Sequence, residues 1–232
     1  MTYSSVVEAT FLSRPNRFLA NVKRNGFCET VHVKNTGRCR ELLIPGCRVY
    51  LADAGNWNWK TRYDLIAVEK EREGQAPLLI NMDSQLPNKV AEEWLKTGTL
   101  FSSEATIQRE RPWGTSRFDF YVEDGERRSF LEVKGVTLEQ DGTAMFPDAP
   151  TQRGIKHLKE LCACKAQGMD AYVLFVIQMK GVHVFRPNDD THPAFGNALR
   201  EAAACGVTLL AVDCLVTKDS VVIDQASPIE LN

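Results

Sequence analysis

The sequence between Ser116 and Leu138 reads SRFDFYVEDGERRSFLEVKGVTL, and it predicts two strands joined by a tight turn. Apolar and polar residues alternate along the first half, and the second half again contains apolar residues at strand positions. Asp124-Gly125 lies between the halves and is the strongest short hairpin signal in the chain.

Three polar residues of the hairpin are the candidate catalytic residues. Glu132 and Lys134 lie two positions apart, so a strand directs both to one face. If the turn is centred between Gly125 and Glu126, Asp119 lies across from Glu132, with Cβ atoms about 4.5–5.5 Å apart. Carboxylates this close repel each other unless a proton or a cation separates them. Mg²⁺ prefers such oxygen ligands and keeps several waters, and Lys134 would orient water or stabilise phosphate charge.

This chemistry is typical of metal-assisted phosphodiester hydrolysis. Asp119 followed by Glu132-Val133-Lys134 resembles the PD-(D/E)xK nuclease motif, although Phe118 stands where the first Pro of that motif would be. Mg²⁺ or Mn²⁺ is the predicted cofactor, with Asp119 and Glu132 as ligands. Short motifs of this kind also occur by chance, and the alternative is a hairpin with cross-strand ion pairs.

Further ligands of the metal are sought on the preceding elements. Glu110 lies on a predicted strand at 106–111, and Glu93 lies on a predicted helix at 87–96, beside Glu92. Spacing alone does not choose between Glu92 and Glu93, and a solvated helix face is the alternative.

The composition is that of an ordinary globular protein, with 44% hydrophobic and 25% charged residues in 232. No apolar run approaches the roughly 18 residues that span a bilayer, and no membrane partner is expected. The first residues lack the pattern of a signal peptide. The seven cysteines include no C-x-x-C pair, which favours reduced thiols and a cytoplasmic location.

Residues 1–83 are predicted to form a small OB-like β-barrel that binds nucleic acid. Six short strands are expected at 6–12, 18–23, 28–34, 48–52, 63–69 and 77–81, with one short helix at 37–43, for which Thr36 is a possible N-cap. Residues 1–80 hold 12 Lys and Arg against 8 Asp and Glu, whereas residues 81–232 hold 16 against 22. Trp57 and Trp59 would stack on bases or pack against the neighbouring domain. The candidate nucleic-acid-binding residues of the whole chain are Arg14, Arg17, Lys23, Arg24, Lys34, Arg38, Arg117 and Arg153.

Residues 84–232 are predicted to form an α/β domain with a mixed sheet. Thr151 is the expected N-cap of a helix that continues to about residue 167 and buries Ile155, Leu158, Leu161 and Cys162, with His157 among its polar members. The apolar run at 171–177 predicts a central buried strand. Gln178 follows at its carboxyl end, where the binding sites of α/β sheets tend to lie. Further strands are expected at 181–185, 207–213 and 220–224, and a further helix at 195–205. Thr151, His157 and Gln178 are additional site candidates.

Several longer segments, in this order, resemble the sugar fermentation stimulation protein family. They are HVKNTGR (32–38), ELLIPG (41–46), YDL (63–65), INMDSQLPN (80–88), TSRFDF (115–120), LEVKGVTL (131–138), AMFPDAPTQRGIKHLKEL (144–161) and LFVIQM (174–179). The resemblance implies an OB-like domain followed by a PD-(D/E)xK nuclease-like domain. It also implies sequence-independent DNA binding and a regulatory link to maltose and sugar metabolism.

Three functional hypotheses follow. The chain is a DNA-binding regulator with a nuclease-type site, or an active metal-dependent DNA or RNA endonuclease, or an oligosaccharide-binding protein that uses the OB-like barrel and the Trp pair. Salt-sensitive binding with little sequence preference and no cleavage is expected of a non-catalytic regulator, because phosphate contacts dominate.

Overall fold

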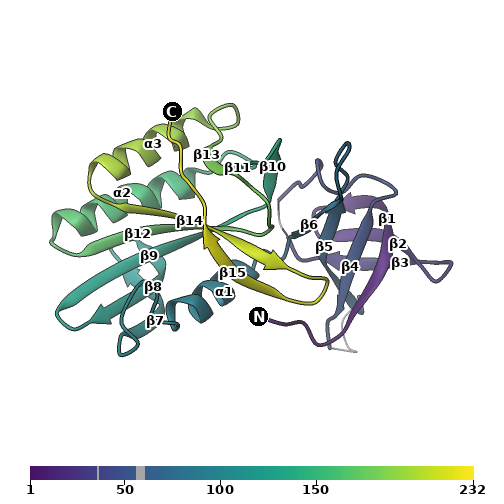
Figure 1. Cartoon of the computed structure of the whole chain (residues 1–232), viewed down its shortest axis with the longest axis horizontal. Helices are drawn as coiled ribbons and strands as arrows, with labels where there is room; N and C mark the ends of the chain where they lie inside the picture. Colours follow the sequence, from purple (N-terminus) through teal and green to yellow (C-terminus); the bar gives the residue numbers. More distant parts are fainter. Residues whose placement is uncertain (36, 56–60) are drawn as a thin grey trace. The chain divides into compact units, whose positions relative to one another are not determined.

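The computed structural model describes residues 1–35, 37–55 and 61–232, and the chain forms two compact units. The first unit consists of Met1–Leu86, Gln178–Lys180 and Cys214–Val222, and the second of Pro87–Ile177, Gly181–Asp213 and Ile223–Asn232. The first unit therefore contains the predicted segment 1–83 and also two short segments from the second half of the chain. Figure 1 labels the strands and helices of both units.

The first unit is a closed β-barrel. Its strands are β1 (Val6–Asn16), β2 (Leu19–Arg24), β3 (Phe27–Val33), β4 (Arg48–Asp53), β5 (Tyr63–Lys70) and β6 (Leu78–Asn81). They pair in the order β3-β2-β1-β4-β5-β6, and an additional parallel pairing of β3 with β5 closes β1 to β5 into a ring. Inward side chains such as Val22, Val49 and Leu65 are fully buried, because alternate residues of each strand face the barrel core. The predicted OB-type barrel is confirmed.

The short helix predicted at 37–43 does not form in the described residues of this segment. The chain makes turns there, with the amide of Leu43 donating to the carbonyl of Cys39 at 3.0 Å. Cys39 is buried and has φ of 44°, a left-handed conformation that interrupts a right-handed helix. The possible N-cap Thr36 lies outside the described residues.

The second unit is built on a mixed six-stranded sheet, although the end of β14 and the start of β15 fall within the segment Cys214–Val222 of the first unit. Its helices and strands are α1 (Leu86–Leu95), β7 (Thr106–Trp113), β8 (Ser116–Asp124), β9 (Arg127–Val136), β10 (Leu138–Gln140), β11 (Thr143–Phe146), α2 (Gln152–Ala166), β12 (Asp170–Ile177), β13 (Val184–Pro187), α3 (Pro193–Ala204), β14 (Thr208–Val216) and β15 (Val221–Ala226). The sheet order is β15-β14-β12-β9-β8-β7. Strands β9, β12 and β14 are parallel, and β7, β8 and β9 are antiparallel neighbours. Strand β12 is buried from Ala171 onward, as its apolar run predicts.

A second, three-stranded sheet has the order β10-β11-β13. The sequence did not predict β10 or β11, which have three and four residues, and it placed β13 three residues too early. Strand β11 runs parallel to β13, from Thr143 opposite Val184 to Phe146 opposite Pro187, so distant pairing decides where these strands lie. No helix of the described chain is both long and apolar enough to cross a membrane.

Helices α2 and α3 lie side by side, and α2 packs on the sheet (Figure 1). Thr151 is the N-cap of α2, and its side chain accepts a hydrogen bond from the amide of Gly154 at 3.0 Å, as predicted. The predicted buried stripe was partly wrong. Leu158 and Leu161 are buried together with Gly154, His157 and Cys164, whereas Ile155 and Cys162 are only half-buried. The sheet-facing side of α2 therefore carries a histidine.

Candidate active site

The β8–β9 hairpin has the predicted register. Paired residues run from Phe120 opposite Leu131 to Asp124 opposite Arg127, around a two-residue turn. The ladder ends at the Phe120 pair, so Asp119 and Glu132 lie just beyond it. In a regular ladder the backbone amide of Val133 would donate to a carbonyl of the neighbouring strand. Here it donates to Oδ2 of Asp119 at 2.8 Å. The opening of the ladder thus brings the Asp119 carboxylate to the backbone of β9.

Asp119 is held by two hydrogen bonds, one on each carboxylate oxygen. Besides the Val133 amide, the Asn88 side chain of α1 donates to Oδ1 at 2.8 Å. Burial raises the pKa of Asp119, and the negative charge of Glu132 raises it further, against the opposing effects of these hydrogen bonds and of Lys134. Asp119 and Glu132 therefore interact electrostatically, as the hairpin register predicts.

Glu132 is buried, with 4% of its surface exposed, and its two oxygens differ sharply. Oε1 lies 2.5 Å from Nζ of Lys134 and is also hydrogen-bonded to Nδ1 of His157. Oε2 is buried and has no hydrogen-bond partner among the described residues. Burial alone would raise the pKa of Glu132, but the hydrogen bond from His157 and the charge of Lys134 hold it below its ordinary value. The side chain is therefore an ionised carboxylate with one oxygen still available.

His157 reaches Glu132 from α2 and is itself held on its other side. Nε of Arg153 lies 3.3 Å from Nε2 of His157. An arginine nitrogen only donates, so Nε2 accepts and Nδ1–H donates to Glu132. The ring of Phe118 packs edge-on against the imidazole, with centroids 6.0 Å apart. Arg153, His157 and Glu132 thus form a chain of hydrogen bonds from the helix surface into the sheet.

The donor set fits a hard divalent cation. Asp119 and Glu132 supply carboxylate oxygens, and the buried Oε2 of Glu132 is an acceptor whose burial without a partner is costly. The described residues contain no group of three or more His, Cys, Asp or Glu side chains placed to hold a metal. A cation at this pair would therefore take its remaining ligands from water or from substrate oxygens, which is usual for Mg²⁺.

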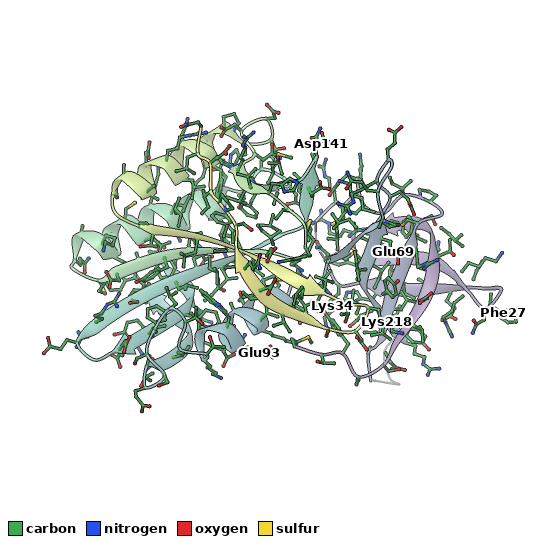
Figure 2. All side chains as sticks on the ribbon, viewed as in Figure 1. Phe27, Lys34, Glu69, Glu93, Asp141 and Lys218 are labelled. Atoms are coloured by element: carbon green, nitrogen blue, oxygen red, sulfur yellow. The ribbon has the colours of Figure 1, made fainter. Side chains whose placement is uncertain are left out.

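The structure does not bring the two further predicted ligands to this pair. Glu110 has φ of 54°, its side chain is 65% exposed, and its carboxylate lies 3.3 Å from the guanidinium of Arg117. Glu93 is exposed on α1 (Figure 2). The neighbouring Glu92 pairs with Lys96 and Arg109.

The predicted nucleic-acid-binding residues fall into two groups. Most of them have protein partners. Arg14 donates to three backbone carbonyls, Arg24 pairs with Glu29, and Lys34 lies near Asp64 and Asp83. Arg117 pairs with Glu110, and Arg153 contacts His157. The exposed residues for which the described chain provides no side-chain partner are Arg17, Lys23 and Arg38.

The remaining candidates are placed as follows. Gln178 is buried in the first unit, where its amide donates to the backbone carbonyls of Asn81 and Asp83, so its contacts stabilise that segment. Thr151 caps α2 and does not contact Asp119 or Glu132. Trp57 and Trp59 lie outside the described residues. The residue that sequence reasoning missed is Asn88, whose position near the start of a helix gave no indication of its contact with Asp119.

A closed five-stranded barrel followed by an α/β unit with an Asp, Glu and Lys constellation defines a two-domain protein of OB and mixed-sheet architecture. The chain belongs to the sugar fermentation stimulation protein family. The family's RE domain matches residues 85–220, and its N-terminal OB domain, SfsA_N, matches residues 12–76.

Relatives of similar length support this assignment. The chain is 56% identical to a sugar fermentation stimulation protein homolog of Desulfitobacterium hafniense over 221 residues, covering 95% of this chain and 94% of that protein. It is 48% identical to the homolog of Ruminiclostridium cellulolyticum over 231 residues, covering 100% of both. A solved structure, described as Pyrococcus furiosus SfsA in complex with Ca²⁺, matches with a TM-score of 0.84 at 28% identity, covering 99% of this chain and 98% of that chain.

Proposed function

We propose that this chain binds DNA without sequence preference and cleaves its phosphodiester bonds with the help of a divalent cation. The observation that carries the proposal is the Glu132 carboxylate. One of its oxygens is held by Lys134 and His157, and the other is buried without a hydrogen-bond partner among the described residues, while the charge of Glu132 raises the pKa of Asp119. A purely structural ion pair would leave no reason to bury that second oxygen unsatisfied.

Asp119 and Glu132 would hold the cation, which is expected to be Mg²⁺ or Mn²⁺. A bound cation at such a site supplies Lewis-acid stabilisation of the charge that develops on the phosphate. The related Pyrococcus furiosus protein is described in complex with Ca²⁺, which also prefers oxygen ligands, and this supports a hard-cation site here.

The protein side chains have separate roles in this proposal. Lys134 would place its ammonium group against a phosphate oxygen or the attacking water. Asn88 and the Val133 amide orient Asp119, and His157 orients Glu132. His157 is a positioning residue, because it acts through Glu132. The basic residues Arg17, Lys23 and Arg38 of the OB barrel would contact the phosphate backbone.

The test is an incubation of labelled single- and double-stranded DNA with the full chain and Mg²⁺ or Mn²⁺. Wild type should cleave only when the cation is present, and Glu132→Gln and Asp119→Asn should each lower the rate by at least about a hundredfold. Glu126→Gln is a matched control, because Glu126 is an exposed carboxylate at the turn of the same hairpin. Cleavage at the wild-type rate by Asp119→Asn would exclude the proposed site.

Binding without cleavage would favour the second candidate, a DNA-binding regulator on a nuclease scaffold with a link to sugar metabolism. In that case all variants of the site should bind DNA as wild type does. The apparent affinity should still fall steeply with salt concentration.

A further inference from the structure

A second group of polar side chains lies in the first unit and takes no part in the proposed cleavage. We name it the Lys34 cluster, and it consists of Tyr3, His32, Lys34, Asp64 and Asp83. His32 lies on β3, Lys34 directly follows this strand, Asp64 is on β5, and Asp83 follows β6. Three of the sequence segments that carry the family resemblance thus meet at one place.

The acidic members of the Lys34 cluster are buried and form hydrogen bonds within the protein. Asp83 is fully buried, and its carboxylate accepts hydrogen bonds from the Tyr3 hydroxyl at 3.1 Å and the Gln85 amide at 2.9 Å. Asp64 is 6% exposed, and its Oδ1 lies 2.8 Å from Nδ1 of His32. Burial and the charge of Asp83 raise the pKa of Tyr3, which keeps its hydroxyl a donor. The acceptors of the cluster therefore face inward.

The basic members retain hydrogen-bonding capacity and reach solvent. Nζ of Lys34 lies 3.6 Å from Asp64 and 3.4 Å from Asp83, longer than the roughly 2.7–2.9 Å of a close charge-assisted bond. The Lys34 side chain is 22% exposed and that of His32 is 38% exposed. With Nδ1 of His32 directed to Asp64, Nε2 is left for an external partner, since the described residues provide none. Lys34 therefore presents a donor to solvent, Nε2 of His32 lies free beside it, and the carboxylates of Asp64 and Asp83 are more buried than both.

The surroundings add positive charge. The Arg14 guanidinium donates to the carbonyls of Arg17, Asn35 and Arg38 at 2.6, 2.9 and 2.5 Å, which brings the turn after β1 next to the segment after β3. The side chains of Arg17 and Arg38 are exposed there. Together with Lys34 these arginines provide four positive charges against the two buried carboxylates. The local field therefore favours an anion.

We propose that Lys34 and His32 bind a phosphate group, with the more buried Asp64 and Asp83 positioning these two side chains. A phosphate offers several acceptor oxygens to the ammonium group, and a protonated imidazole donates from both nitrogens. A metal ion is the less suitable occupant, because the Lys34 ammonium already lies near both carboxylates and the described chain has no group of three ligands. The phosphate belongs either to a nucleic-acid backbone or to a phosphorylated small molecule. Only the first source rests on the proposed DNA binding.

The experiment uses the full chain and three probes: inorganic phosphate, glucose 6-phosphate and a short oligothymidylate. The His32 ring signals are followed by NMR during each titration, and oligothymidylate affinity is measured by fluorescence anisotropy at several salt concentrations. Lys34→Gln is expected to lower the affinity for the probe about 5- to 10-fold. For oligothymidylate, it should also reduce the slope of log affinity against log salt concentration by about 1. Lys218→Gln is the matched control, because Lys218 is an exposed lysine of the same unit (Figure 2). This variant should change the affinity for each probe, and its dependence on salt concentration, only slightly.

A loss confined to oligothymidylate assigns the phosphate to nucleic acid, and a loss confined to glucose 6-phosphate assigns it to a small molecule. His32 signals that do not move with any probe, or a Lys34→Gln variant that equals Lys218→Gln with every probe, would overturn the proposal. If Lys34→Gln folds poorly, His32→Gln replaces it, because His32 is more exposed and its loss should perturb folding less. If the wild-type chain does not cleave DNA but its His32 signals and probe affinities respond as expected, only the nuclease proposal is rejected.

Discussion

Replacing His157 by Leu should destabilise the second unit, because it removes the hydrogen bond from His157 to Glu132. Leu has nearly the volume of His, so the change removes the hydrogen bonds of the imidazole with little change in packing. His157 is 3% exposed, and its Nδ1 supports a buried, ionised carboxylate. Hydrogen bonds to charged groups contribute about 1.5–3 kcal/mol, and a buried acceptor that loses its donor costs at least as much. A loss of about 2 kcal/mol is therefore expected.

The change is measured by calorimetry, because two compact units need not unfold in one transition. For a domain of this size, about 2 kcal/mol corresponds to a decrease in Tm of roughly 4–8 °C. His183→Leu is the matched control, since His183 is exposed in the same unit and its loss should change the stability by less than about 0.5 kcal/mol.

A double-mutant cycle decides whether the effect passes through Glu132. In the Glu132→Gln background the carboxylate charge is gone, so His157→Leu should cost clearly less, with a coupling of about 1–2 kcal/mol. Additive effects of the two changes, or a decrease in Tm no larger than that of His183→Leu, would refute the interpretation that His157 supports the carboxylate.

Two further predictions concern stability outside the candidate site. Gly142 has φ of 79°, and a Cβ there would lie 2.6 Å from the His183 ring, so Gly142→Ala should destabilise the second unit by about 1–3 kcal/mol in chemical denaturation. A second change, His183→Ala, should restore only the steric part, because the strained backbone remains; full recovery would contradict the conformational argument. For Asp170, burial would raise the pKa, but hydrogen bonds from Lys165 and Arg127 hold it below its ordinary value. Its contribution is therefore fully present above the ordinary pKa and is lost as the pH falls through the lowered pKa, so Asp170→Asn should cost less than about 1 kcal/mol near neutral pH and progressively less in acid. An Asp170→Asn effect that does not change with pH would contradict this pairing.

The sequence by itself determined the hairpin and the pair of catalytic candidates on it. The Asp124-Gly125 signal predicts a tight turn, which forms as a two-residue loop of Gly125 and Glu126, and the period of two along a strand then places Glu132 and Lys134 on one face. These rules are local, since they depend only on neighbouring residues and on the turn between them. For the same reason the apolar run of β12 sufficed to predict a buried central strand.

Only the tertiary structure decided which further residues join Glu132. His157 lies 25 residues away, and it meets Glu132 because α2 packs its face against the sheet. Gly154, His157, Leu158 and Leu161 have the spacing of three and four residues that defines one helix face. Because His157 is polar, the sequence analysis assigned it to the exposed face of the helix, which was wrong. Helix packing, unlike strand alternation, does not follow from side-chain polarity at one position.

The same limit applies to the distant partners of Glu110, Lys34 and β11. Glu110 pairs with Arg117 on the neighbouring strand, closure of the barrel brought Lys34 to Asp64 and Asp83, and pairing with β13 formed β11. Each of these arrangements joins segments that are separated in sequence, and each depends on the packing free energy of the whole unit. Local propensity therefore predicted most of the helices and strands, whereas the contacts that define both proposed sites were decided by how those elements pack.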